Sequence, residues 1–205
     1  MLERVKTSKM NGKLEGLQAV SVNTRSNPFC QKMSQSGANT ICSHCYSMAT
    51  LKRGYFPNLE PALEHNSRLL SKPLEEAQFP KFKRKTKYIR FDAHGELLDE
   101  PFGGIQLDNY VRIVKANPDK KFALWSKRIP IVRKYFKNRE IPGNLRLVYS
   151  NPIINKVMEK PPVPFHKTFN NVTDDTEQNC TGQKCKDCLL CYTVNDVTTI
   201  VEIKK

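Results

Sequence analysis

The sequence predicts an α/β fold, either a partial (β/α) barrel or an open parallel sheet, with a cysteine-rich metal-binding segment at its C-terminal end. Short apolar runs alternate with helical stretches, a pattern that favours parallel strands joined by right-handed crossovers. The chain has 205 residues, whereas a complete eight-fold barrel typically needs about 250. We therefore expect a single domain over residues 1–205, with a partial α/β core at 14–160 and a cysteine-rich segment at 161–205.

Five short runs rich in β-branched and aromatic residues are the expected strands: residues 17–22, 88–91, 122–125, 145–149 and 198–203. Helices are expected at residues 45–53, 58–70, 107–116 and 129–136, with 151–158 as a further candidate. In the second of these helices, Leu59, Leu63 and Leu70 recur at helical spacing after a capping Asn58. The strand at 198–203 is the last in the chain, and we expect it at an edge of the sheet.

Polar residues directly follow the inner strands. They are Asp92 and His94 after the first, Ser126, Lys127 and Arg128 after the second, and Ser150 and Asn151 after the third. Ligands of parallel α/β folds bind at the carboxyl ends of the strands. The first cysteine loop also follows a strand, so it opens on the same edge. Ordinary turn chemistry explains any one of these residues, but their coincidence at one edge predicts a site there.

Seven cysteines form two groups that lie far apart in the chain. They are Cys30, Cys42 and Cys45 near the N-terminus, and Cys180, Cys185, Cys188 and Cys191 near the C-terminus. Disulfides do not persist in a reducing compartment, and an odd count leaves one thiol unpaired in any compartment. The C-terminal run repeats a two-residue gap, which lets one loop wrap thiolates around a compact metal centre. All seven are therefore candidate cofactor and metal ligands.

The N-terminal group fits more than one kind of site. A Cys-x-x-Cys pair occurs in zinc sites, in redox dithiols and in iron–sulfur sites. His44 lies inside the pair, either as a ligand or as a neighbouring imidazole. Together the seven thiols fit one shared cluster with spare cysteines, or two clusters of which one lacks a protein ligand. No histidine follows the C-terminal run, and all-sulfur ligation fits both iron–sulfur and zinc sites. The tight, repeated run favours a [4Fe-4S] cluster there, with structural zinc as the alternative.

The charge and the hydropathy of the chain bear on its partners. Lysine and arginine number 34 against 20 acidic residues, a formal net charge of +14, which favours polyanions or an acidic host redox protein as partners. Two stretches, 81–87 and 127–139, concentrate basic residues, and the first either grips nucleic acid or is a solvated loop. No apolar run approaches the roughly 20 residues that span a bilayer. We therefore expect a soluble cytoplasmic protein with no membrane partner.

The order of these motifs resembles that of a known phage family. The motifs are Cys30, Cys42-Ser-His-Cys45-Tyr46, Tyr-Phe-Pro at 55–57, Asn66, the strands that contain RF, FALWSKR and LVYSN, and the closing cysteine run. This order is similar to that of the phage "gene product 88" family over nearly the whole chain. The resemblance implies a virus-encoded cytoplasmic protein with an iron–sulfur cluster. Where that family has Ser-Gly-Asp after the RF strand, this chain has His94-Gly95-Glu96.

A looser similarity is to radical S-adenosylmethionine enzymes. Those enzymes have a partial α/β barrel, a three-cysteine cluster after the first strand and a Gly-Glu motif after the second. Gly95-Glu96 stands in the matching place here, but Cys30, Cys42 and Cys45 are eleven and two residues apart instead of three and two. The similarity implies a related architecture and leaves the chemistry open.

Three functions follow from these observations. The first is a [4Fe-4S] protein in electron transfer or small redox chemistry in an infected cell, because sulfur-ligated iron exchanges single electrons. The second is a zinc-stabilised nucleic-acid-binding protein. The third is an enzyme like the radical S-adenosylmethionine family. The sequence alone does not decide whether the protein is an enzyme.

Overall fold

The fold is described from a computed structural model for residues 2–174 and 178–204. Its centre is a seven-stranded sheet in which the strands follow one another in chain order. The first two strands are antiparallel, and every later pair is parallel. The strands are β1 (Ser8–Lys9), β2 (Gln18–Val20), β3 (Tyr88–Phe91), β4 (Lys121–Ser126), β5 (Leu145–Ser150), β6 (Lys167–Val172) and β7 (Thr199–Ile203). The sheet is open, which selects the second of the two expected architectures.

In the part of the chain that the structure describes, six α-helices and three short 3₁₀ turns connect the strands. The α-helices are α1 (Pro28–Ser34), α2 (Tyr46–Arg53), α3 (Leu59–Leu70), α4 (Phe102–Lys115), α5 (Ile129–Phe136) and α6 (Cys185–Cys188). The 3₁₀ turns are η1 (Gly12–Leu14), η2 (Ile41–His44) and η3 (Glu76–Gln78). The expected helix at 107–116 begins earlier, at Phe102, and Asn58 starts α3 without a side-chain capping bond.

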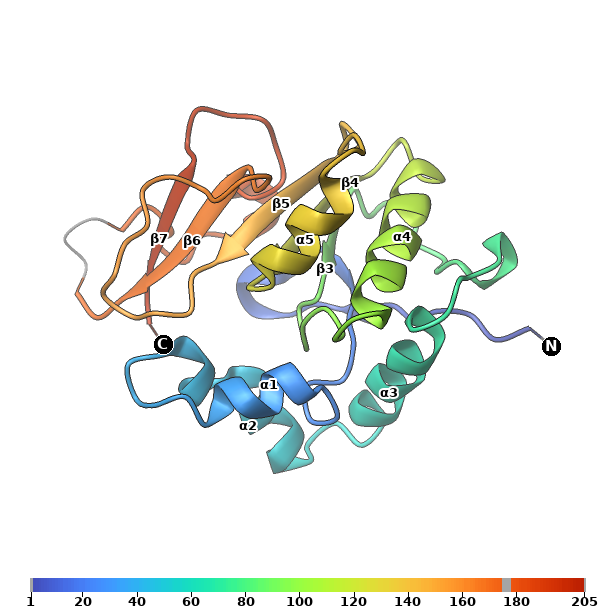
Figure 1. The fold of residues 1–205 in the computed structure, drawn as a ribbon, viewed down its shortest axis with the longest axis horizontal. Helices are drawn as coiled ribbons and strands as arrows, with labels where there is room; N and C mark the ends of the chain where they lie inside the picture. Colours follow the sequence, from blue (N-terminus) through green and yellow to red (C-terminus); the bar gives the residue numbers. More distant parts are fainter. Residues whose placement is uncertain (1, 175–177, 205) are drawn as a thin grey trace.

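Helices α4 and α5 cover one face of the sheet, with α3 beside them (Figure 1). Successive residues of a strand point to opposite faces, and the larger apolar side chains of β3 and β4 point to the helices: Ile89, Phe91, Phe122 and Leu124. The ring of Tyr110 in α4 stacks on Phe91 with centroids 4.0 Å apart. Burial of each such side chain contributes about 1.5–3 kcal/mol, so this layer is the main core.

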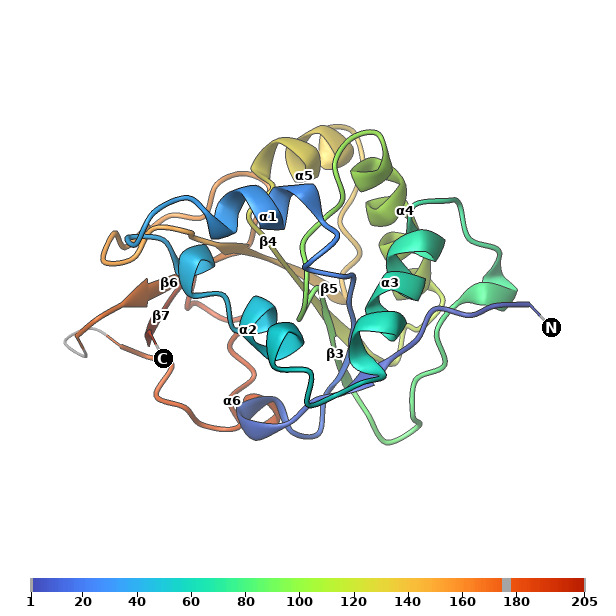
Figure 2. The ribbon, with the colours of Figure 1, turned by 90° about the horizontal axis from the view of Figure 1, so that it is seen from below.

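The opposite face of the sheet carries small residues among larger ones. Ala19 of β2 and Ala123 of β4 pack there with Tyr192 of the C-terminal segment, beside Tyr88 and Trp125. The short helix α6 lies on this side, away from α4 and α5 (Figure 2). Small side chains leave room here, so the cysteine-rich segment folds back against the sheet.

The sequence analysis missed β6 and α1, and it was wrong about residues 151–158. Those residues form turns and a bridge between Thr40 and Ile153 instead of a helix. β6 is too polar to show a strand pattern, yet all six of its residues are buried. Its Asn170 accepts hydrogen bonds from the Asn151 side chain and the Met158 backbone. Partners supplied by the fold therefore allow this polar strand to be buried.

The cysteine-rich C-terminal segment is continuous with the core. β6 and β7 lie within residues 161–205 and extend the same sheet, and β7 is its edge strand as expected. In the part of the chain that the structure describes, no helix combines the length and the apolar character that crossing a membrane requires.

Candidate functional site

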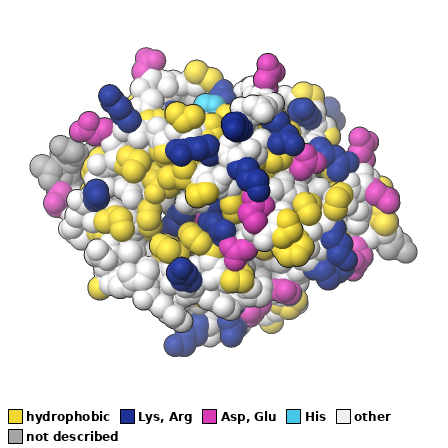
Figure 3. Space-filling view, viewed as in Figure 1, with side chains coloured by type: hydrophobic (Ala, Val, Ile, Leu, Met, Phe, Trp, Pro, Cys, Tyr) yellow, Lys and Arg dark blue, Asp and Glu magenta, His cyan; other side chains and the backbone are white. Residues whose placement is uncertain are grey.

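A cavity of about 380 Å³ lies at the carboxyl edge of the parallel strands. Cys30, Cys42 and Cys45 all line it, together with Asp92 and Glu96, which follow β3. The face seen in Figure 3 shows a hollow near its middle, with hydrophobic side chains around it and Lys or Arg side chains inside. The structure therefore brings the N-terminal cysteine group to the edge that the sequence predicts. We call Cys30, Cys42 and Cys45 the triad.

The loop after β2 is held against the loop after β3. Asn27 caps α1 by accepting a bond from the Cys30 backbone N–H, and its amide donates to the Glu96 carbonyl at 2.8 Å. The Gly95 N–H donates to the Thr24 hydroxyl at 2.8 Å. These bonds fix the first thiol beside Glu96. Sequence analysis overlooked Asn27, although an Asn before a Pro is a typical helix start.

The second half of the cysteine loop is held from two sides. The Ile41 N–H donates to the Pro152 carbonyl at 2.8 Å, which ties η2 to the loop after β5. The Tyr46 hydroxyl donates to the Ala93 carbonyl, and Ser47 hydrogen-bonds His94 Nδ1 at 2.8 Å. Cys42 and Cys45 are therefore anchored to the ends of β3 and β5, although the loop itself has little regular structure.

Glu96 organises one wall of the cavity. Its side chain is buried, and Oε1 accepts bonds from the Ser126 hydroxyl at 2.6 Å and the Leu97 N–H at 2.9 Å. Its Oε2 accepts from the Lys127 N–H at 2.8 Å. The carboxylate thus joins the ends of β3 and β4. Glu96, the acidic residue of the Gly-Glu motif, therefore has a structural role.

Lys127 places an ammonium beside the triad. Its Nζ donates to the Ser150 hydroxyl at 3.2 Å. Burial by itself lowers the pKa of Lys127, but the Cys42 thiol and the Glu96 carboxylate more than offset this, so the pKa lies above its ordinary value. Lys127 therefore remains a cation at the cavity wall.

The triad thiols affect one another electrostatically. Burial raises the pKa of Cys30 and Cys42, and Cys45 raises both further, whereas Lys127 opposes the shift. Burial therefore favours the protonated form of the Cys30 and Cys42 thiols when no cation is bound, so a metal that binds here must displace their protons.

Asp92 is a buried carboxyl group at the cavity. Its Oδ1 accepts a bond from the Tyr110 hydroxyl at 2.7 Å, whereas its Oδ2 has no hydrogen-bond partner. Burial raises its pKa well above the ordinary value, and the nearby Glu96 carboxylate raises it further. Asp92 therefore favours its neutral, protonated form, and one of its oxygens has no partner.

The remaining polar candidates have structural partners. His94 is buried on Ser47, and burial lowers its pKa to about 4. Arg128 pairs with Asp99 at 2.6 Å, and the Asn151 amide donates to the Lys156 carbonyl at 2.6 Å. His44 lines the cavity, but its Nε2 lies 3.2 Å from the Ala38 carbonyl oxygen. Their roles are those of ordinary turn residues.

Gly95 is required for its close approach to β2. Its φ is +75°, and a Cβ there would lie 2.6 Å from both the carbonyl oxygen and a side-chain methyl of Val22. We expect Gly95→Ala to destabilise the protein by at least about 2 kcal/mol in chemical denaturation. Gly143 has open space around it, and Gly143→Ala is the control, expected within about 0.5 kcal/mol of the parent. Equal stability of the two variants would contradict this account.

The four C-terminal cysteines form a second group, which we call the quartet: Cys180, Cys185, Cys188 and Cys191. Each of Cys185 and Cys191 has its pKa raised by burial and by the other quartet thiols. The Cys180 N–H donates to the Val201 carbonyl in β7 at 3.0 Å, which joins the quartet to the edge of the sheet. The Lys13 ammonium lies 3.9 Å from Cys180 Sγ.

Neither the triad nor the quartet is arranged around a single metal ion in the described part of the chain. Within residues 2–174 and 178–204, no three Cys, His, Asp or Glu side chains stand where they could hold one metal ion. Zinc requires its sulfurs within about 2.3 Å of one centre. In a [4Fe-4S] cluster each thiolate binds a different iron, so the ligands stand farther apart. Whether either group binds a metal stays a prediction.

The two basic stretches differ in their surroundings. In the first, the basic residues are exposed: Lys81, Lys83, Arg84, Lys85 and Lys87. This stretch precedes β3 and so lies away from the carboxyl edge that holds the cavity. In the second, Lys127 lines the cavity, and Lys134 pairs with Glu100. Much of the second stretch therefore serves the fold.

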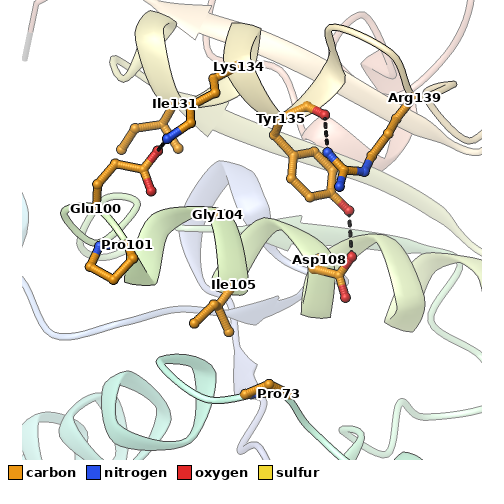
Figure 4. Close-up of a pocket in the computed structure, with 10 residues that line it drawn as sticks. All are labelled: Pro73, Glu100, Pro101, Gly104, Ile105, Asp108, Ile131, Lys134, Tyr135 and Arg139. Atoms are coloured by element: carbon orange, nitrogen blue, oxygen red, sulfur yellow. Dashed lines mark hydrogen bonds and ion pairs between the residues drawn. The ribbon is translucent and has the colours of Figure 1, made fainter.

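Another concave surface lies between α4 and α5 (Figure 4). Its charged side chains pair with one another: Lys134 with Glu100 at 3.2 Å, and the Tyr135 hydroxyl with Asp108 at 2.9 Å. Arg139 donates to the Tyr135 carbonyl and lies over its ring. No cysteine lines it, so the cavity at the carboxyl edge is the better candidate site.

Comparison with known proteins gives one match. The family model described as "Gene product 88" matches residues 2–182. The chain belongs to the gene product 88 family. No curated protein matched the chain, and no solved structure did. The resemblance to this phage family noted in the sequence is thereby confirmed.

The region that matches the gene product 88 model includes the triad but only one cysteine of the quartet. Residues 2–182 contain the triad and every cavity residue that precedes β7. The match ends after Cys180 and before the other three quartet cysteines. Sequence analysis also missed Arg90 and Trp125 as lining residues, although an arginine inside the apolar run of β3 was a usable signal, because buried charges are rare without a partner.

Proposed function

We propose that this gene product 88 protein is an iron–sulfur protein of small redox chemistry, with a [4Fe-4S] cluster held by Cys30, Cys42 and Cys45. One observation carries the proposal: three thiols from a single loop line one cavity at the carboxyl edge of a parallel sheet. An all-sulfur set suits iron–sulfur ligation. Three thiolates for four irons leave one iron to be ligated from the cavity.

The residues around the triad fit an anionic centre. Lys127 supplies a buried cation next to the thiols, and Ser150 holds it there. Glu96 fixes the backbone at Lys127, so the ammonium is presented from a rigid strand end. When bound, the cluster would accept or release one electron. The net charge of +14 favours an acidic redox protein as the electron-transfer partner.

The cavity suits a small molecule as the group that meets the open iron. Its volume of about 380 Å³ lies in the range of small-ligand pockets. Asp92 contributes an unpaired carboxyl oxygen, and Lys127 contributes an ammonium. These groups are able to bind both ends of a polar ligand.

A second candidate is an S-adenosylmethionine-dependent enzyme of the radical type. Gly95 and Glu96 follow the second parallel strand and line the same cavity as the cysteine loop after the first. The strands follow in chain order, as the similarity implies. However, both Glu96 oxygens already accept bonds from the protein, which favours the first candidate.

Anaerobic purification and single cysteine variants test the proposal. Cys30→Ala, Cys42→Ala and Cys45→Ala are each expected to lose the iron of this site, about four per chain. Electron paramagnetic resonance of the parent should change when sulfide or S-adenosylmethionine is added, because a ligand can reach the open iron. A response to S-adenosylmethionine alone would favour the second candidate.

Ser43→Ala is the matched control, because Ser43 lies in the same loop and its hydroxyl only bonds the Thr40 carbonyl. It is expected to keep full iron content. Undiminished iron and unchanged spectra in all three cysteine variants would contradict the proposal. A colourless protein with stoichiometric zinc would favour the zinc-stabilised nucleic-acid-binding alternative.

A further inference from the structure

Three hydrogen-bond donors near the quartet have no acceptor. In the described residues, four buried side-chain atoms lack a partner, and three of them are donors: Arg90 Nε, Trp125 Nε1 and Tyr192 Oη. Leaving such a donor unpaired costs about 1–3 kcal/mol. Three at one place therefore indicate an acceptor that belongs to a bound group.

All three donors adjoin the quartet. Tyr192 follows Cys191 directly and is almost fully buried on the small-residue face of the sheet. Trp125 and Cys191 both pack against the apolar clusters of that face. The Arg90 guanidinium lies over the Trp125 ring, 4.1 Å from its centroid. A group bound by the quartet would therefore bring acceptors to these donors.

Two cations lie by the quartet. The Lys13 ammonium lies 3.9 Å from Cys180 Sγ and also pairs with Glu202, and the Arg90 guanidinium lies over the Trp125 ring, 4.1 Å from its centroid. A cluster held by four thiolates carries a net negative charge, which these cations would offset in part.

The repeated two-residue gap of the quartet favours a cluster over one zinc ion, because it lets one loop wrap thiolates around a compact centre. A cluster also carries inorganic sulfide, which gives the three donors acceptors beyond the thiolates themselves. Hydrogen bonds to cluster sulfurs raise the reduction potential, because they stabilise the more negative reduced state.

We propose that Cys180, Cys185, Cys188 and Cys191 bind a second [4Fe-4S] cluster, closed by four protein thiolates, whose sulfurs accept hydrogen bonds from Arg90, Trp125 and Tyr192. Arg90, Trp125 and Lys13 also line the cavity. These three side chains therefore lie between the second site and the cavity. This inference is argued from the quartet and its neighbours. The centre it proposes is additional to the cluster proposed for the triad.

Metal analysis separates the two sites. The full chain, reconstituted anaerobically with iron and sulfide in the presence of equimolar zinc, should bind about eight irons per chain. The triple variant Cys30→Ala, Cys42→Ala, Cys45→Ala should keep about four, and the triple variant Cys185→Ala, Cys188→Ala, Cys191→Ala should lose four. Zinc in the quartet, or no metal that depends on it, would overturn the inference. If the full chain binds iron only at the quartet, the proposed function of the triad is contradicted and the inference about the quartet is not.

Reduction potentials test the three donors. In the triad-free variant, Tyr192→Phe and Trp125→Phe are each expected to lower the ratio of reduced to oxidised centre at a fixed applied potential by roughly threefold or more. Tyr135→Phe is the matched control, since its hydroxyl bonds Asp108 between α4 and α5 (Figure 4). These helices lie on the other side of the sheet from α6, which carries Cys185 and Cys188 (Figure 2).

Two outcomes decide the role of the donors. Unshifted titrations in both quartet variants, or equal shifts in the Tyr135→Phe control, would show that the donors do not reach the centre. If the triad-free variant fails to fold, the same titrations on the otherwise unaltered chain resolve the quartet signal as the one that added sulfide leaves unchanged.

Discussion

Glu96→Ala is expected to destabilise the protein by about 3–5 kcal/mol. The Glu96 side chain is 3% exposed, and it accepts bonds from Ser126, from Leu97 and from the backbone of Lys127. Removing the carboxylate leaves these donors unpaired and takes away an anion that acts on the Lys127 ammonium. Chemical denaturation followed by circular dichroism measures the loss.

Glu96→Gln is the matched control for this prediction. The amide keeps one oxygen acceptor, which can still take the bonds from Ser126 and Leu97. Its NH₂ group, however, replaces the acceptor of the Lys127 N–H by a donor. An intermediate loss of about 1–3 kcal/mol is therefore expected. A loss below about 1 kcal/mol for Glu96→Ala would show that the carboxylate does not hold the two strand ends together.

The contribution of Asp92 to folding stability is expected to fall as the pH rises above about 4. Its folded-state pKa is raised well above the ordinary value of 3.8, mainly by burial and then by Glu96. The folded chain therefore keeps a proton that the unfolded chain releases. The stability from this group is complete below the unfolded pKa and is lost up to the folded pKa, by at most about 1.4 kcal/mol per pH unit.

Asp92→Asn isolates this contribution. The backbone at residue 92 has φ +53°, which Asn adopts readily, and an amide oxygen still accepts from the Tyr110 hydroxyl. Denaturation at several pH values should give the variant a flatter dependence than the parent, with similar stability near pH 4 and a growing advantage above it. Parallel curves for the two proteins would contradict the raised pKa.

The periodicity of the sequence was sufficient to predict most of the sheet. Residues 88–91, 122–125 and 145–149 are short runs rich in apolar, aromatic and β-branched side chains, and all three are strands of the sheet. The helices at 129–136 and 58–70 were found in the same way, because each presents one apolar face. Strand β6 was missed because its polar side chains are paired only by residues distant in the sequence.

The sequence by itself also determined the two cysteine groups and their placement on a strand end and on the C-terminal segment. That the triad meets Glu96 and Lys127 in one cavity was decided by the tertiary structure, through bonds such as that of Asn27 to the Glu96 carbonyl. The tertiary structure also placed Arg90 and Trp125 between the triad and the quartet. Spacing along the chain sets which thiols share a loop, whereas the neighbours of a buried thiol depend on strands that pair across long stretches of sequence.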